Sequence, residues 1–262
     1  MNIFCMNRRL CYEPTFDIIS RCSEQFKNVS GNFYVYTLPQ KFDLEIPSYI
    51  NVSDSDTFLE SIRTLPNIKV LVMTPVGAEY VLNRISNEVI TIYENHCNYD
   101  RELRTRKEVK VVGYSGSQRC LGLNPFELKG YLKNVGLEFK VLWLEESTTR
   151  KEIVDFYKTI DISIAYRIPY IRKPHPPEMK GTIKLTSPGS FKIPTVAFPD
   201  CVYKGLNLDC YVKAYSIKDV VNGCKLLATN KDMYETYSNL AYEYAKDKHI
   251  DTIVKQYNQL IN

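Results

Sequence analysis

The sequence lacks a closely spaced set of His and Cys metal ligands and a long apolar run. Its three histidines lie far apart, and none of its eight cysteines belongs to a C-x-x-C pair. Because zinc sites use closely spaced ligands, this spacing argues against a metal site. No apolar run is long enough for a membrane span, and residues 1–6 are too short for a signal peptide. We therefore expect free thiols in a reducing cytoplasm.

The common nucleotide-binding motifs are also missing. The chain has no G-x-G-x-x-G motif and no Walker lysine, and we find no internal repeat. The formal net charge of +4 permits an anionic ligand but does not demand nucleic acid. With 262 residues, 44% of them hydrophobic, the chain can form one large or two small soluble domains.

Segments with strand-like and helix-like patterns alternate along the chain. In the first half, strands are expected at 2–6, 32–38, 49–52, 68–73 and 89–94, and helices at 15–26, 54–65 and 78–85. In the second half, strands are expected at 109–114, 138–142 and 161–165, and helices at 125–134, 149–159, 216–229, 231–246 and 248–261. This alternation predicts an α/β fold with parallel sheets covered by helices on both faces.

A polar, charged run at 95–107 interrupts the alternation. We interpret it as the connection between two Rossmann-like, doubly wound domains, at 1–100 and 101–262. A surface helix within one continuous domain is the alternative. Two doubly wound sheets predict a ligand cleft between the domains, at the carboxyl ends of their strands.

The stretch KLTSPGSFKIPTVAFP at 184–199 is the most distinctive part of the sequence. Small polar residues lead into a short apolar run, which predicts a short helix, a tight connection and a buried parallel strand. The N-terminus of such a helix favours a phosphate group, and Lys184, Thr186 and Ser187 would add to the binding.

This stretch resembles the K-L-x-[E/N]-A-x-[AS]-x-G-x-P-x-[VI]-A segment of GT-B glycosyltransferases, which binds the diphosphate and ribose of a nucleotide sugar. The matching positions are Lys184, Leu185, Thr186, Ser190, Pro194, Val196 and Ala197. Ser187 replaces the usual Glu or Asn, and Lys192 replaces the usual Gly. A looser resemblance to small phage and bacterial enzymes extends over most of 109–261, and some of those enzymes modify DNA bases.

Other candidate donor-binding residues follow strands of the second half. Gly113, Ser115 and Gly116 belong to GYSGS, which is either a diphosphate-facing loop or a simple tight turn. Tyr166 and Arg167 follow the strand at 161–165, where Arg167 is either a bidentate phosphate ligand or a surface residue.

The catalytic candidates are His96, Glu94 and Glu178. His96, with Glu94 near it, is either a general base or a hydrogen-bonded residue between domains. Retaining GT-B enzymes of family 4 carry two Glu eight residues apart; here Met179 stands eight residues before Ser187, and Glu178 stands nine before it. The resemblance also puts four residues on the acceptor side: Arg8, Arg9, Tyr99 and Arg101.

These observations predict a metal-independent glycosyltransferase without a cofactor. It would transfer a hexose or pentose from a nucleotide-diphosphate sugar, such as a UDP-sugar, to a hydroxyl of a modified DNA base, a glycan or a small molecule. A phage-encoded chain would act in the host cytoplasm. The alternatives are a sugar-nucleotide epimerase or phosphorylase of the same fold, and a non-catalytic module that binds nucleotide sugars.

Overall fold

The chain forms two compact units. The computed structural model describes residues 2–5, 32–35, 48–52, 56, 59–65, 67–105, 108–145, 147–167 and 176–260. The first unit takes its described residues from 1–94, 170–181 and 250–262, and the second takes them from 95–169 and 182–249. Instead of crossing once after residue 100, the chain passes between the units at 94–95, between the described residues 167 and 176, at 181–182 and at 249–250. The helix expected at 15–26 lies outside the described residues.

The first unit contains a parallel sheet whose neighbouring strands follow one another in the chain. The strands are β1 (Asn2–Cys5), β2 (Asn32–Val35), β3 (Ser48–Asn51), β4 (Ile68–Val72) and β5 (Val89–Thr91). The helices α2 (Leu59–Ile62) and α3 (Pro75–Leu82) connect β3 to β4 and β4 to β5. Right-handed connections in this order place both helices on one face of the sheet. The described strands therefore do not have the doubly wound order expected for this half.

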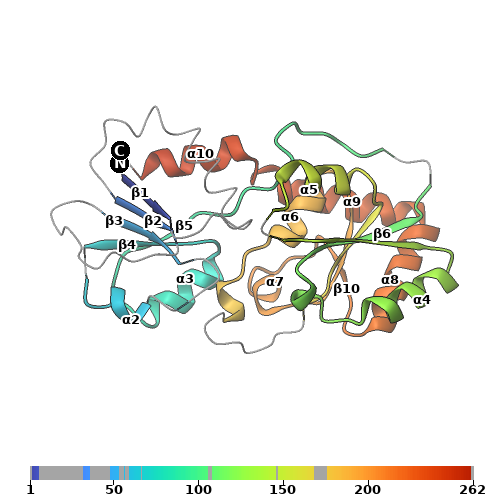
Figure 1. The fold of residues 1–262 in the computed structure, drawn as a ribbon, viewed down its shortest axis with the longest axis horizontal. Helices are drawn as coiled ribbons and strands as arrows, with labels where there is room; N and C mark the ends of the chain where they lie inside the picture. Colours follow the sequence, from blue (N-terminus) through green and yellow to red (C-terminus); the bar gives the residue numbers. More distant parts are fainter. Residues whose placement is uncertain are drawn as a thin grey trace. The chain divides into compact units, whose positions relative to one another are not determined.

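The last described helix covers the other face of this sheet. Helix α10 (Ile250–Gln259) lies opposite α2 and α3 across the strands (Figure 1). It buries Ile250, Ile253 and Tyr257, and the Tyr49 hydroxyl of β3 donates to the Leu260 carbonyl at 2.6 Å. In a doubly wound sheet, a reversal of strand order places helices on the second face. Here α10, from the end of the described chain, covers that face instead.

The second unit is doubly wound. Its parallel sheet has the order β10-β9-β8-β6-β7. The strands are β6 (Val111–Gly116), β7 (Glu138–Trp143), β8 (Ile162–Ala165), β9 (Thr195–Ala197) and β10 (Val212–Lys213). The chain goes from β6 to β7 on one side and then returns to β8 on the other. The switch point between β6 and β8 is where such sheets bind ligands, outside the carboxyl ends of the strands.

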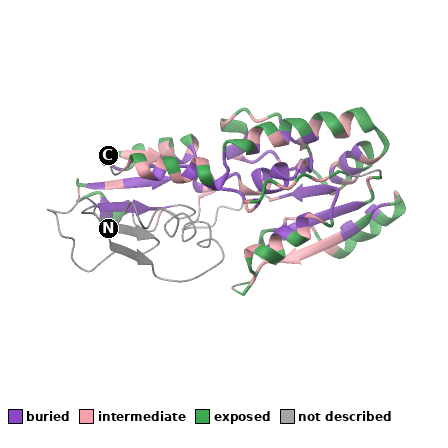
Figure 2. Cartoon of the chain, turned by 90° about the horizontal axis from the view of Figure 1, so that it is seen from above, coloured by how far each residue is buried: buried purple, intermediate pink, exposed green. Residues whose placement is uncertain are grey.

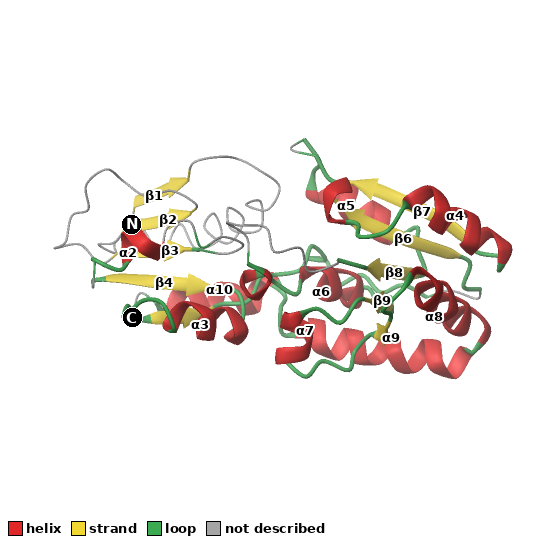
Figure 3. Ribbon diagram, turned by 90° about the horizontal axis from the view of Figure 1, so that it is seen from below, coloured by secondary structure: helices red, strands yellow, loops and turns green. Residues whose placement is uncertain are grey.

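Helices cover both faces of the second sheet. Those on one face are α4 (Pro125–Asn134) and α8 (Ile217–Thr229), and those on the other are α5 (Arg150–Tyr157) and α6 (Ile183–Ser190) (Figures 1 and 3). Helix α9 (Lys231–Lys246) packs against α6 and α8. In this unit β6, β8 and β9 are buried throughout, whereas α4, α5, α8 and α9 carry exposed residues (Figure 2).

The distinctive stretch at 184–199 forms the expected helix, turn and strand, as α6 and β9. Gly189 lets α6 approach α9 closely, because a Cβ there would lie 2.5 Å from the Ala241 carbonyl oxygen. After the helix, Lys192 has φ +59°, the left-handed conformation that favours glycine. The GT-B segment that this stretch resembles usually has Gly at this position. Here Lys192 adopts the left-handed conformation in place of that Gly.

None of the described helices is both long enough and apolar enough to cross a membrane.

Candidate functional site

The end of β6 lies at the switch point of the second sheet. The strand continues through Ser115 to Gly116 and pairs with β7 as far as Trp143, so the loop expected at 115–117 begins later than the sequence suggests. Gly113 lies inside the strand, where a Cβ would come within 2.5 Å of Ile160 Cγ2. The structure thus gives Gly113 a packing role that needs no ligand.

Lys184 reaches this strand end from the first turn of α6. Its ammonium donates a hydrogen bond to the Ser115 carbonyl and lies 4.9 Å from the centre of the Tyr114 ring. A Cβ on Gly116 would collide with Lys184 Nζ and would lie 2.6 Å from the Tyr114 hydroxyl oxygen. Gly116 therefore leaves the space in which the ammonium and the phenol ring meet.

The surroundings of Lys184 favour loss of its proton. Burial, together with the positive charge of Arg167, lowers the pKa of the Lys184 ammonium to about 8. The positive charges of Lys184 and Arg167 thus repel each other. In the described part of the chain, no carboxylate binds Lys184. An anion bound here would offset both the desolvation and the repulsion.

Arg167 follows β8, on the other side of the switch point. Its Nη2 donates to Asp200 Oδ2 at 2.8 Å, and Asp200 is only 4% exposed. The other oxygen of Asp200 accepts the Tyr203 amide hydrogen at 3.0 Å and so caps α7 (Cys201–Gly205). Arg167 is therefore held in place by a carboxylate that is itself fixed by a helix start. Asp200 follows the strand end at Pro199, a position typical of an N-cap, and the sequence already marks it as a cleft candidate.

The remaining expected donor-binding residues are buried. The Tyr166 hydroxyl donates to the Tyr215 carbonyl at 2.7 Å, and the Tyr166 ring packs edge-on against Phe198. Leu185, Thr186 and Ser187 are at most 4% exposed. Their contact with a donor stays a prediction.

His96 lies in the interior of the second unit. It is 3% exposed, and its Nδ1 accepts the amide hydrogen of Asn98 at 3.2 Å. Burial, followed by the positive potential of His249 and Arg101, lowers the pKa of His96 to about 3. A ring that stays neutral down to such a pH is a weak proton acceptor, which argues against the general-base interpretation.

Two residues expected on the acceptor side contact this same interior region. Arg101 has φ +53°, and its Nη2 lies 3.1 Å from His249 Nδ1. The Tyr99 hydroxyl accepts a hydrogen bond from Asn95 at 2.9 Å, and Arg150 lies 4.3 Å above the Tyr99 ring. All of these residues belong to the second unit and not to the first, where an acceptor-side role would put them.

The two acidic candidates belong to the first unit. Glu94 follows β5, and its carboxylate fills the space that a Cβ of Gly181 would need. Glu178 lies on the 3-10 helix η3 (Pro177–Met179), which packs on α3, and Met179 is buried in the core of this unit. Arg8 and Arg9 lie outside the described residues.

Lys184, Ser115 and Gly116 thus meet at the end of β6, and Arg167, after the neighbouring strand β8, adds its positive charge to the surroundings of Lys184. Cationic side chains at such strand ends are of the kind that bind phosphate in other proteins. Within the described residues, no group of three or more His, Cys, Asp or Glu side chains could hold a metal ion.

Comparison with known proteins supports the fold. No protein-family model matches the sequence, and no curated protein matches it. Among solved structures, the chain is similar to WaaG, a glycosyltransferase involved in lipopolysaccharide biosynthesis, with a TM-score of 0.64 and 7% identity over 100% of both chains. It is similar to TarM with a TM-score of 0.58 and 13% identity, over 94% of this chain but only 57% of TarM.

The similarity to HepE of Anabaena, solved in complex with UDP, has a TM-score of 0.57 and 11% identity, over 92% of this chain and 81% of HepE. At such low identities the similarity shows the fold alone. Across most of its length, this chain has the fold of GT-B glycosyltransferases.

Proposed function

We propose that the protein is a glycosyltransferase of the GT-B type that transfers a sugar from a nucleotide-diphosphate sugar to an acceptor hydroxyl. The observation that carries this proposal is the pair of cationic side chains, Lys184 and Arg167, at the switch point of the second sheet. The fold shared with WaaG, and with HepE in complex with UDP, supports it.

In this proposal the donor diphosphate binds at the carboxyl ends of β6 and β8. Lys184 and Arg167 stabilise the negative charge that develops on the departing nucleotide diphosphate, so no metal ion is needed for that purpose. Asp200 holds the Arg167 guanidinium in place through its hydrogen bond. Gly116 provides the space for Lys184 beside the strand.

The first unit is proposed to bind the acceptor. Glu94 or Glu178 would take the proton of the acceptor hydroxyl, because the low pKa of His96 leaves that ring a poor base. The expectation of a DNA base as acceptor gains no support from the similar structures.

Isothermal titration calorimetry with UDP-, GDP- and ADP-sugars tests the proposal. We expect one of them to bind, and its nucleoside diphosphate to bind as well. Folded protein that binds none of these compounds would refute the proposed donor site.

One observation favours the alternative of a non-catalytic module. Ser187 stands where the resembling segment has Glu or Asn, and it is buried and hydrogen-bonded to Cys97. Incubation of the protein with the donor that binds separates the possibilities. A transferase releases nucleoside diphosphate by transfer or slow hydrolysis, an epimerase returns an isomerised donor, and a module leaves the donor intact.

A further inference from the structure

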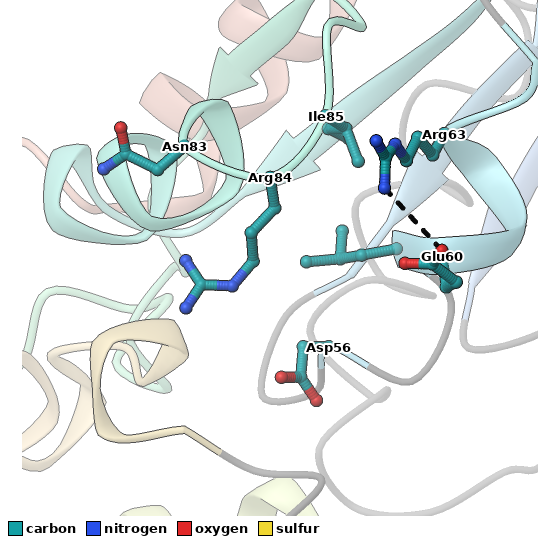
Figure 4. Close-up of a pocket in the computed structure, with 7 residues that line it drawn as sticks. Asp56, Glu60, Arg63, Asn83, Arg84 and Ile85 are labelled. Carbon is teal, nitrogen blue, oxygen red and sulfur yellow. Dashed lines mark ion pairs between the residues drawn. The ribbon is translucent and has the colours of Figure 1, made fainter.

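The first unit has a polar pocket between α2 and the end of α3. Its volume is about 480 Å³, within the range of small-ligand sites. Around the opening lie Asp56, Leu59, Glu60, Arg63, Arg84 and Ile85. Figure 4 shows the side chains of Asp56, Glu60, Arg63 and Arg84 around one open space. None of these residues belongs to the anion site on the second sheet.

The charges around the pocket balance. Asp56 and Glu60 carry two negative charges, and Arg63 and Arg84 carry two positive ones. A phosphate or another strongly charged ligand would gain little net attraction here, because each charge of one sign has a counterpart of the other. The lining instead offers both hydrogen-bond acceptors and hydrogen-bond donors, which a neutral ligand rich in hydroxyl groups can use together.

Neighbouring groups orient two of these charged side chains, Asp56 and Arg84. The Tyr80 hydroxyl donates to Asp56 Oδ2 at 2.8 Å. Arg84 lies 3.5 Å from the centre of the Tyr80 ring and donates from Nη1 to the Tyr80 carbonyl at 2.7 Å. Arg63 Nη1 lies 3.8 Å from Glu60 Oε1, and both side chains remain largely exposed. Side chains held before binding lose less conformational entropy when a ligand arrives.

The pocket also has a small apolar part. Leu59 and Ile85 line it while packing into the core of the first unit, with exposures of 4% and 6%. A sugar ring presents hydroxyl groups at its edge, which match the balanced charged groups, and C–H groups on its faces, which can contact the exposed atoms of Leu59 and Ile85.

We infer that this pocket between α2 and α3 binds a neutral saccharide. This inference rests on the proposed function in one respect: a sugar-transferring enzyme would use such a site to hold a saccharide acceptor. The binding itself requires no nucleotide sugar, so it can be tested separately from the proposed donor site.

Saturation-transfer NMR on the full chain, without nucleotide, is the test. The probes are the methyl glycosides of glucose, galactose, mannose and N-acetylglucosamine, together with maltose. We expect at least one of them to bind, and we expect Glu60→Gln and Arg63→Met each to weaken its Kd about tenfold, as for loss of a hydrogen bond to a charged group. Both residues are exposed, so these variants should fold.

The matched control is the exposed pair of Lys231 and Glu235 on α9, whose charged atoms lie 3.6 Å apart. Lys231→Met and Glu235→Gln should leave saccharide binding unchanged. The inference is overturned if no glycoside binds, if Glu60→Gln and Arg63→Met bind as tightly as the parent, or if inorganic phosphate or an acidic peptide binds in the pocket instead. Calorimetry with nucleotide sugars on the same variants shows separately whether the donor site works.

Discussion

The ammonium group of Lys184, from the first turn of α6, donates a hydrogen bond to the main-chain carbonyl of Ser115 at the end of β6. Among the described residues, this carbonyl is the one hydrogen-bond partner of that ammonium. A phosphate would be a stronger partner, because its negative charge adds a Coulombic attraction that the neutral carbonyl lacks. Three predictions follow from this arrangement.

Replacing Lys184 by Met should weaken donor binding about 10- to 150-fold, as expected for losing about 1.5–3 kcal/mol from a charge-assisted hydrogen bond. Calorimetric titration of the nucleotide sugar measures the change. The variant should remain folded, because a pKa of about 8 in the folded state means that the buried ammonium opposes folding at neutral pH. Unchanged affinity in a folded Lys184→Met protein would rule out the proposed phosphate contact.

Donor affinity should fall as the pH rises above about 8, because Lys184 then loses its proton before the ligand arrives. The expected slope is about a tenfold loss per pH unit above that pKa. Titrations between pH 6.5 and 9.5 test this, with Lys184→Met as the control that should lack the slope. A parent protein whose affinity is flat across this range would show that Lys184 is not involved.

Adding a methyl group at Gly116 should displace the Lys184 ammonium, since the new Cβ would overlap with Nζ and with the Tyr114 hydroxyl. We expect Gly116→Ala to lower the free energy of unfolding by about 1–3 kcal/mol, as for other overpacked positions, and to weaken donor binding. Urea denaturation and calorimetry give the two readouts. Gly130→Ala is the control, because a Cβ there meets no atom within 4 Å.

The turn after α6 contains a residue in a strained conformation. Lys192 has φ +59°, so Lys192→Gly should stabilise the protein by about 0.5–1 kcal/mol, the left-handed strain of a non-glycine residue less the entropy of glycine in the unfolded chain. Urea denaturation measures this change. Lys192→Ala keeps the strain and removes the contact with Asn239, so it should bring no gain. Equal stability of the Gly and Ala variants would contradict this explanation.

His96 should make folding sensitive to acid. Its pKa is about 3 in the folded protein against 6.5 ordinarily, so the unfolded chain binds the extra proton between these values. Stability is thus lost as the pH falls from 6.5 toward 3, by up to about 1.4 kcal/mol per pH unit from this residue. His96→Asn keeps an acceptor for the Asn98 amide and should lose less stability between pH 7 and pH 4. Identical pH dependence in both proteins would mean that His96 is protonated in the folded state.

Local sequence patterns predicted most elements of the second unit. Small polar residues followed by an apolar run predicted α6 and β9, and α4 has the predicted bounds.

In the first unit, helix α3 begins three residues before the predicted start at 78, because Pro75 occupies the first turn and Thr74 caps it. Strand order in the first sheet was not predictable, since periodicity reports which residues form strands but not which strands are neighbours.

The candidate site was predicted in part. Lys184 could be predicted from its position at a helix start, and Arg167 from its position after a strand. Tyr99 and Arg101 lie in a polar segment that suggests a linker, yet they contact Asn95 and His249 within the second unit. The contacts of Tyr99 and Arg101 with His249 join residues 150 and 148 positions apart, which no local pattern reveals. Gly113 was expected to face a ligand for the same reason, because its neighbour Ile160 comes from the connection between α5 and β8.

The return of α10 to the first sheet has a practical consequence for dissecting this molecule. Because each unit is assembled from separate stretches of the chain, no single cut can release either of them whole. A fragment that stops before residue 250 would leave one face of the first sheet without Ile253 and Tyr257. To study the first unit alone, the chain must therefore be re-engineered so that α10 is joined directly to the rest of that unit.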